Sequence, residues 1–351
     1  MSEARYRLLG GPGSPYSLKV RAVLRYRHLP HLWIVPQGPV GASPELRLAG
    51  KGMLPVMQIP EGAYWADSTP ILYALETRHP GRRSILPPDP ADAFLAHLIE
   101  DFADELLFMV LFESRWANAA DRSFCARRQI SGWVGTMPKA PFEAMVAAFD
   151  ARQTKLLASY GDLDSNRAFL DALYVRVLDA IESLVTESRH LFGSRPSIAD
   201  FGLYGQLSQL AIDPTGSATM KALAPRAFQW VQDLDDASGV DGEWRATGSQ
   251  APAALDALLD LIAKTFLPYL AAHVRGLRDG LDEVVLEGFG HPLRVRPKKY
   301  RQRCLLWLKA ELAALDPGAR ARVRRALNDD AAWTILQPAA GELPAPPHVP
   351  L

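Results

Sequence analysis

The segment from Gly13 to Arg21 holds the first residues whose types could do chemistry. It falls where a predicted strand turns into a helix, and Pro15 suits the first helical position, which places Ser14 at the N-cap. A helix N-terminus presents unpaired N–H groups and the positive end of the helix dipole, so a thiol bound there loses its proton more easily. A hydroxyl that donates to the sulfur would lower the pKa of that thiol further. Ser14 is therefore either a helix cap alone or the activator of a bound thiolate.

A second segment, Met53-Leu54-Pro55-Val56, opens a predicted strand. In the simplest interpretation Pro55 stands at a strand start, where a proline removes no ladder hydrogen bond. If the Leu54–Pro55 bond were cis, the N–H and C=O groups of Leu54 would point sideways. They could then pair with an extended peptide as one more strand would.

A third segment, Asp67-Ser68-Thr69-Pro70, precedes a predicted helix. Ser68 or Thr69 could serve only as a cap that holds the helix end. The same helix N-terminus could instead bind a carboxylate through the hydroxyl and N–H of Ser68, while Asp67 pairs with an ammonium. Together the two residues would hold the amino-acid end group of a ligand.

The elements around these segments predict a small mixed domain followed by helices. Residues 1–80 follow the order βαβαββα, and the proline-rich residues 81–90 read as a linker. From residue 91 to 240 the apolar spacing is helical, with later helices expected at 141–160, 166–189, 197–212 and 218–237. Residues 251–351 are expected to form a mostly helical extension. Its predicted helices cover about 253–277 and 298–327, with a possible hairpin closing over Gly288 to Pro292.

The order and spacing of the three segments resemble the N-terminal domain of the glutathione S-transferases, and Ser14-Pro15-Tyr16 is most similar to the Ser-Pro-Phe of the tau class. The resemblance implies an α/β thioredoxin-like domain followed by an all-helical domain with extra C-terminal helices. It also implies that Ser14 activates the glutathione sulfur. The expected glutathione-binding residues are Leu54 before a cis Pro55, which pairs with the cysteinyl backbone, and Asp67 with Ser68 on the γ-glutamyl end.

Two features extend the resemblance and one departs from it. Ser197 to Asp200 forms a capping box similar to the one that opens the central helix of the family's second domain. The apolar stripe from Leu95 to Trp116 is either core or, in part, the wall of a second-substrate pocket with Tyr16, Phe108, Phe112 and Trp116. The departure is Met53, where the family often has a basic residue; Lys51 is the nearby candidate for the glycyl carboxylate.

Composition limits the other classes of function. The chain has 39 basic and 39 acidic residues, so no global field directs it toward nucleic acid or a membrane. Cys125 and Cys304 form no CxxC, which argues against a zinc module and is typical of a reducing compartment. No metal site is expected, and no apolar run approaches the roughly 18 residues that span a bilayer. The basic residues of 294–303 are expected on a solvated helix face or against the core, with an anionic partner as the alternative.

We therefore expect a cytoplasmic enzyme that binds glutathione as co-substrate and conjugates its thiolate to a small hydrophobic electrophile. The family's usual twofold dimer is the expected assembly, although the extension could cover that interface. The alternative is a non-catalytic glutathione- or ligand-binding scaffold, because a fold does not fix a function.

Overall fold

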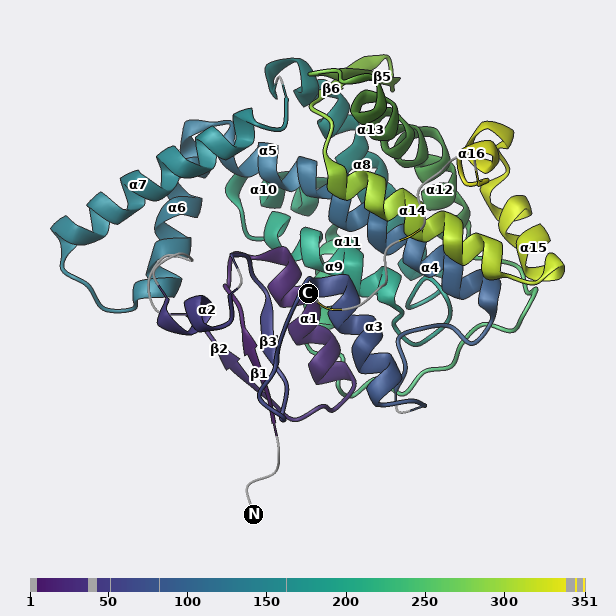
Figure 1. Cartoon of the computed structure of the whole chain (residues 1–351), viewed down its shortest axis with the longest axis horizontal. Helices are drawn as coiled ribbons and strands as arrows, with labels where there is room; N and C mark the ends of the chain where they lie inside the picture. Colours follow the sequence, from purple (N-terminus) through teal and green to yellow (C-terminus); the bar gives the residue numbers. More distant parts are fainter. Residues whose placement is uncertain are drawn as a thin grey trace.

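The computed structural model describes residues 5–36, 43–50, 52–81, 83–161 and 163–338, together with Ala345 and Pro350. Within these residues a small four-stranded sheet and three helices form the N-terminal domain, and helices dominate everything that follows (Figure 1). The predicted fold class, a thioredoxin-like domain before a helical domain with extra C-terminal helices, is confirmed. Most of the predicted loose tail from 338 to 351 lies outside the described residues.

The N-terminal domain has the predicted order βαβαββα. In the sheet the strands run β2-β1-β3-β4, with β1 parallel to β2 and antiparallel to β3. Side chains alternate across this sheet, so Leu8 and Met57 join the main core, whereas Leu9 and Val56 pack with Leu46 of α2 on the other face. The elements are β1 (Tyr6–Leu9), α1 (Pro15–Tyr26), β2 (His31–Ile34), α2 (Pro44–Leu48), β3 (Val56–Gln58), β4 (Tyr64–Ala66) and α3 (Ser68–Arg78).

The helical domain is arranged around α9 (Ile198–Leu210), whose residues are all buried. The predicted capping box is present: the Asp200 carboxylate accepts from the Ser197 N–H at 2.8 Å and also from the Leu191 N–H at 3.0 Å. The surrounding helices are α4 (Pro90–Phe102), a π-helical turn η1 (Ala103–Leu107), α5 (Phe108–Trp116), α6 (Ala119–Val134), α7 (Lys139–Ala158), α8 (Leu163–Glu187), α10 (Pro214–Leu223) and α11 (Pro225–Asp235).

The structure differs from the sequence predictions at three helices. The single helix expected at 218–237 is two helices, because Pro225 has no N–H for the preceding turn and starts α11 instead. Pro317 divides the helix expected at 298–327 in the same way. Helix α6 was not predicted, because much of its sequence is polar and its buried apolar residues form only a narrow stripe along the helix.

The extension packs on the helical domain and shares its core. Helices α14 and α15 contact α4, and α12 contacts α8 (Figure 1). One continuous apolar cluster includes residues of the sheet, of α9 and of the extension. Its elements are α12 (Ala253–Leu261), η2 (Ile262–Phe266), α13 (Leu267–Asp279), β5 (Val284–Gly288), β6 (His291–Val295), α14 (Lys299–Ala314), α15 (Pro317–Leu327) and α16 (Asp330–Ile335).

The continuous helix Ala253–Asp279 corrects one expectation. It is long and apolar enough to cross a bilayer, with a mean hydropathy of 1.3 in its most apolar window, although no spanning run was expected from the sequence. However, 67% of that window is buried inside the protein. Its apolar residues are therefore accounted for by packing against α8 and α14.

The capping box gives a test of this architecture. Asp200→Ala removes the carboxylate that two buried backbone N–H groups share, so we expect the free energy of unfolding to fall by about 2–4 kcal/mol. Asp316→Ala is the matched control, because Asp316 caps α15 at an exposed site, and it should change stability by about 1 kcal/mol or less. Urea unfolding measures both. If both variants lost the same small amount of unfolding free energy, the central role of α9 would be contradicted.

Candidate functional site

Ser14 stands at the start of α1, where the sequence predicted it. It is the N-cap residue, and its Oγ accepts a hydrogen bond from the Ser17 N–H at 3.3 Å. The side chain is only partly buried, whereas Pro15 beside it is buried. The hydroxyl therefore caps the helix and still has its own proton available for another acceptor.

The loop before Ser14 is held through its carbonyl groups. Arg115, buried on α5, donates to the Gly13 carbonyl at 2.9 Å and to Asp213 Oδ2 at 2.6 Å. Arg128 and Gln209 both donate to the Pro12 carbonyl, at 3.2 and 3.3 Å. Three helices of the second domain thus fix the position of a residue in the first.

Helix α6 lies directly against this loop. A Cβ atom on Gly13 would lie 2.4 Å from Cγ of Gln129, and one on Gly11 would lie 3.0 Å from Nε1 of Trp133. Gly13 is therefore required by close approach of a helix that the sequence did not predict.

The Leu54–Pro55 peptide bond is cis, as the resemblance implies. Leu54 is partly exposed immediately before β3, and β3 pairs with β1 at Val56 and Leu9. Met53 is 78% exposed and offers no charge to a ligand. Lys51, the predicted partner of the glycyl carboxylate, lies outside the described residues.

Asp67 and Ser68 lie at the start of α3, but their capping roles differ from the prediction. Asp67 is the N-cap residue without a side-chain cap bond, and Ser68 is the first helical residue. Asp67 has φ 76° and ψ 115°, a conformation that a residue with a side chain rarely adopts and that costs about 1–3 kcal/mol. Its Oδ2 accepts a hydrogen bond from the Tyr300 hydroxyl of α14 at 2.8 Å.

Behind Ser68 lies a fully buried ammonium group. Lys19 on α1 pairs with Asp104 and lies 2.5 Å from Glu100 Oε1, while Thr69 donates to the same Glu100 oxygen at 2.7 Å. Burial alone would lower the pKa of Lys19, but the Asp104 and Glu100 carboxylates outweigh it and raise that pKa. Lys19 is therefore a permanent cation beneath the start of α3.

The carboxyl groups around Lys19 titrate differently. Burial raises the pKa of Asp104 to about 7, although Lys19 acts in the opposite direction. The pKa of Glu100 is lowered, because Lys19 and His97 outweigh its desolvation. Burial also raises the pKa of Glu105 to about 7, and Arg301 of α14 lies 2.9 Å from its Oε2. Glu100 lies on α4 just before η1, and Asp104 and Glu105 lie within η1; π-helical turns of this kind are frequent at functional sites.

One group of these residues is close enough to hold a metal ion. The ligand atoms of His97, Glu100 and Asp101 lie within 4.8 Å of one another, the one such group among the residues that the structure describes. His97 Nδ1 lies 2.7 Å from Glu311 Oε2, and Glu100 is paired with Lys19. The candidate ligand atoms of His97 and Glu100 are thus already paired with charged side chains. We therefore interpret the group as an ion-pair network and assign no metal to it.

The four residues expected to line a second-substrate pocket form a row of ring contacts. Tyr16 and Phe108 lie 5.9 Å apart between centroids, and Phe108 stacks on Phe112 at 5.1 Å. Tyr16 and Phe108 are partly exposed. Phe112 and Trp116 are only 6% and 1% exposed and belong to the apolar cluster of α5, α6 and α7. Only the Tyr16 end of the row is open to solvent.

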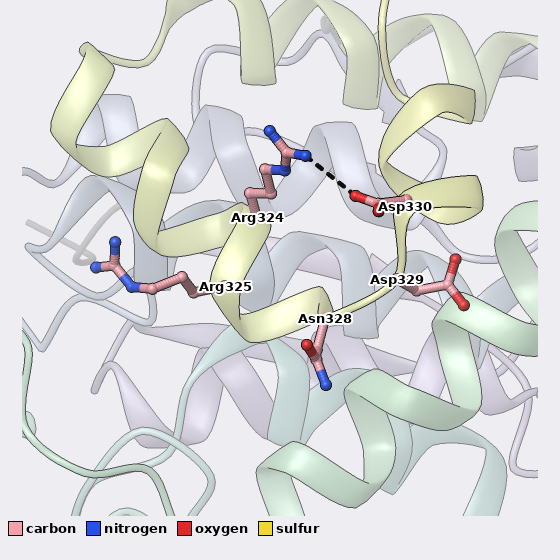
Figure 2. A pocket seen from close by; sticks show the side chains of 5 residues that line it. All are labelled: Arg324, Arg325, Asn328, Asp329 and Asp330. Atoms are coloured by element: carbon pink, nitrogen blue, oxygen red, sulfur yellow. Dashed lines mark hydrogen bonds and ion pairs between the residues drawn. The ribbon is translucent and has the colours of Figure 1, made fainter.

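Two surface hollows contain none of these residues. One, of about 260 Å³, lies between α15 and α16 and is lined by charged side chains, with Arg324 donating to Asp330 at 3.1 Å (Figure 2). The other, of about 290 Å³, lies between α6 and α7. The first contains one ion pair of its own, and neither hollow includes Ser14 or Asp67.

Sequence reasoning missed Lys19, the acidic residues of α4 and η1, and Tyr300. A signal for the acidic group was present: four acidic residues fall between 100 and 105 in an otherwise apolar helix. Charges within an apolar stripe are costly unless they are paired, which predicts buried partners. No feature of the sequence around Tyr300 indicated its contact with Asp67, because the two residues lie 233 positions apart.

The geometry defines a class of protein: a thioredoxin-like domain with a hydroxyl at the first helix N-terminus, joined to a helical domain. Two family models match the chain. The N-terminal domain of glutathione S-transferase matches residues 13–78, and its C-terminal domain matches residues 164–233. Both matched segments are thus recognised as domains of the glutathione S-transferase superfamily. No curated protein matches its sequence.

Several solved structures are similar to part of the chain. A glutathione S-transferase from Methylobacterium radiotolerans, in complex with glutathione sulfonate, is 22% identical over 70% of this chain and 99% of its own, with a TM-score of 0.42. One from Rhodospirillum rubrum is 20% identical over 72% and 99%, with a TM-score of 0.43. A tau-class enzyme from mango, Mangifera indica, is 17% identical over 66% and 89%, with a TM-score of 0.41. Such low scores add nothing to the family assignment.

The ion-pair network predicts a pH dependence of stability. Burial alone would lower the pKa of His97, but Glu311 and Asp101 raise it to about 10. The resulting stabilisation is fully present below the ordinary histidine pKa of about 6.5 and is lost as the pH rises through 10. We therefore expect the gap in unfolding free energy between wild type and His97→Gln to be widest near pH 6 and to narrow toward pH 10. A constant gap in urea unfolding across this range would contradict the assignment.

Proposed function

We propose that this protein is a glutathione transferase that conjugates the glutathione thiolate to a small hydrophobic electrophile. The observation that carries the proposal is the partly exposed Ser14 hydroxyl at the start of α1, in a domain of this superfamily. Asp67 and Ser68 would hold the γ-glutamyl end, and Leu54 would pair with the cysteinyl backbone beside the cis Pro55. Lys51 is the proposed contact for the glycyl carboxylate.

Ser14 would act by stabilising the thiolate rather than by reacting. Its hydroxyl would donate to the sulfur, the thiol proton would leave to solvent, and the α1 dipole would favour the anion. The sulfur lone pair then forms a bond to the electrophilic carbon. In a substitution the pair of the broken bond departs with the leaving group; in an addition the π pair moves to the electron-withdrawing group, and solvent supplies a proton. The rate would come from thiolate stabilisation and proximity.

The electrophile would bind beside Tyr16 and Phe108, the partly exposed end of the aromatic row. Phe112 and Trp116 would support these rings from behind. Apolar and aromatic walls are typical of small-molecule pockets, which fits a hydrophobic second substrate. The Tyr16 hydroxyl donates to the Asp104 carbonyl at 2.9 Å, so this ring has a fixed position.

A glutathione- or ligand-binding scaffold without turnover is the second candidate. The exposed, uncharged Met53 favours it, because one expected contact to the glycyl carboxylate is missing there. Glutathione binding without turnover of any electrophile would support this candidate over the first.

We further propose a cytoplasmic protein and a homodimer, the usual assembly of the family. The extension restricts where such a dimer could form, because α14 and α15 cover one side of α4 and α9 covers another. Light scattering coupled to size exclusion would establish the assembly.

The conjugation reaction tests the role of Ser14. In Ser14→Ala the thiolate loses one hydrogen bond, so we expect kcat/KM to fall by about 10–100-fold, with little change in glutathione affinity. The assay is conjugation of activated aryl halides and α,β-unsaturated carbonyl compounds. Ser43→Ala is the matched control, because Ser43 caps α2 through a bond to the Leu46 N–H and should leave the rate unchanged. Unchanged conjugation in Ser14→Ala would overturn the assigned role.

A further inference from the structure

The Asp67 carboxylate receives its hydrogen bond from the C-terminal extension. Among the residues that the structure describes, the Tyr300 hydroxyl is the one hydrogen-bond donor to this carboxylate, at 2.8 Å from Oδ2. Asp67 itself is partly exposed. One carboxylate oxygen is therefore held by the protein, and the other has no protein donor among these residues.

Helix α14 holds the Tyr300 hydroxyl in a fixed place. Arg301, the next residue, is buried and lies 2.9 Å from Glu105 Oε2. The Tyr300 ring meets the Trp307 ring edge-on at 6.3 Å, and the Arg303 guanidinium lies 4.2 Å from the same Trp307 ring. Cys304 and Leu308 are fully buried. The Tyr300 ring is thus packed against the core, which fixes the position of its hydroxyl.

The backbone at Asp67 also indicates a site rather than a structural contact alone. Its positive φ is a strained conformation that only the surrounding structure can maintain, and such conformations cluster at ligand-binding positions. A partly exposed residue with no role would be expected to relax or to be replaced by glycine.

We propose that Tyr300 is a positioning residue that holds one oxygen of Asp67 so that the other oxygen can pair with the ammonium group of the ligand. The extension is then part of the ligand site. This inference rests on the proposed function, because the ammonium concerned is that of the γ-glutamyl group.

Charges around Asp67 are consistent with this role. Burial raises the pKa of Asp67, and the hydrogen bond from Tyr300 acts against that rise. Ammonium binding needs the ionised carboxylate, so it is lost as the pH falls through the pKa of Asp67. The other charged groups that influence Asp67 or are influenced by it are Lys19, Arg303, Glu100, Asp104 and Glu105.

The opposite interpretation is that Tyr300 blocks Asp67 and excludes the ligand. The two interpretations predict opposite effects when the hydroxyl is removed, since a block would be relieved and a support would be lost.

The experiment compares glutathione with glutaryl-cysteinyl-glycine, which lacks only the α-amino group, by calorimetry. In Tyr300→Phe we expect glutathione to bind about tenfold more weakly, because a hydrogen bond to a charged group is lost. The amino-free analogue should bind as it does to wild type. Tyr174→Phe is the control: it removes a different tyrosine hydroxyl, one that is buried in the helical domain and donates to the Gly216 carbonyl, and it should change neither affinity.

The pH profile gives a readout that general loosening would not produce. The affinity of glutathione relative to the analogue should fall at a higher pH in Tyr300→Phe than in wild type. A fluorinated tyrosine at position 300 keeps the shape of the ring and is a stronger donor, so it should shift the midpoint to lower pH. This substitution also serves as the test if Tyr300→Phe does not fold.

Each outcome decides between the interpretations. Tighter or unchanged glutathione binding in Tyr300→Phe overturns the inference, as does equal weakening of both ligands. The inference can fail in this way while the proposed function stands, provided that wild type binds glutathione and Asp67→Asn does not. If wild type binds neither ligand, the proposed function fails and the inference fails with it.

Discussion

A lysine ammonium buried between two carboxylates joins the two domains, and the position of the site depends on it. Lys19 extends from α1 to Glu100 and Asp104 on α4 and η1, beneath the start of α3. An unpaired buried charge is very costly, so the three groups are stable only together. Ser14 begins α1 and Asp67 precedes α3. Pairing α1 with α4 therefore fixes both ends of the proposed glutathione site relative to the helical domain.

The extension adds a second set of charges to the same arrangement. Arg301 pairs with Glu105 of η1, and Tyr300, the residue before Arg301 on α14, donates to Asp67. The Arg301–Glu105 pair is buried and the Tyr300–Asp67 bond is partly buried, and the Tyr300 ring packs against the apolar core that runs from the sheet to α14. The extension is thus bound to the helical domain by buried ion pairs as well as by apolar area, and the site draws on all three parts of the chain.

Local sequence patterns predicted much of this arrangement, whereas the contacts between residues far apart in the sequence could not be predicted. Pro15 identified Ser14 as an N-cap, and Ser197 with Asp200 identified the start of α9, because caps depend on residues within one turn. The break before Pro225 follows from the same kind of local signal, because proline cannot continue the preceding helix. In contrast, the contact of Tyr300 with Asp67 and the packing of α6 on Gly13 depend on how distant helices meet. Their residues have no local feature that distinguishes them from ordinary surface or core.

The central claim is that glutathione binds with its sulfur at Ser14 and its ammonium at Asp67. A crystal structure of the full chain with glutathione tests this most directly. The account predicts the sulfur within hydrogen-bond distance of Ser14 Oγ, and the ammonium on the Asp67 oxygen that Tyr300 does not hold. Glutathione bound elsewhere, or bound here in the reverse direction with its ammonium away from Asp67, would contradict it.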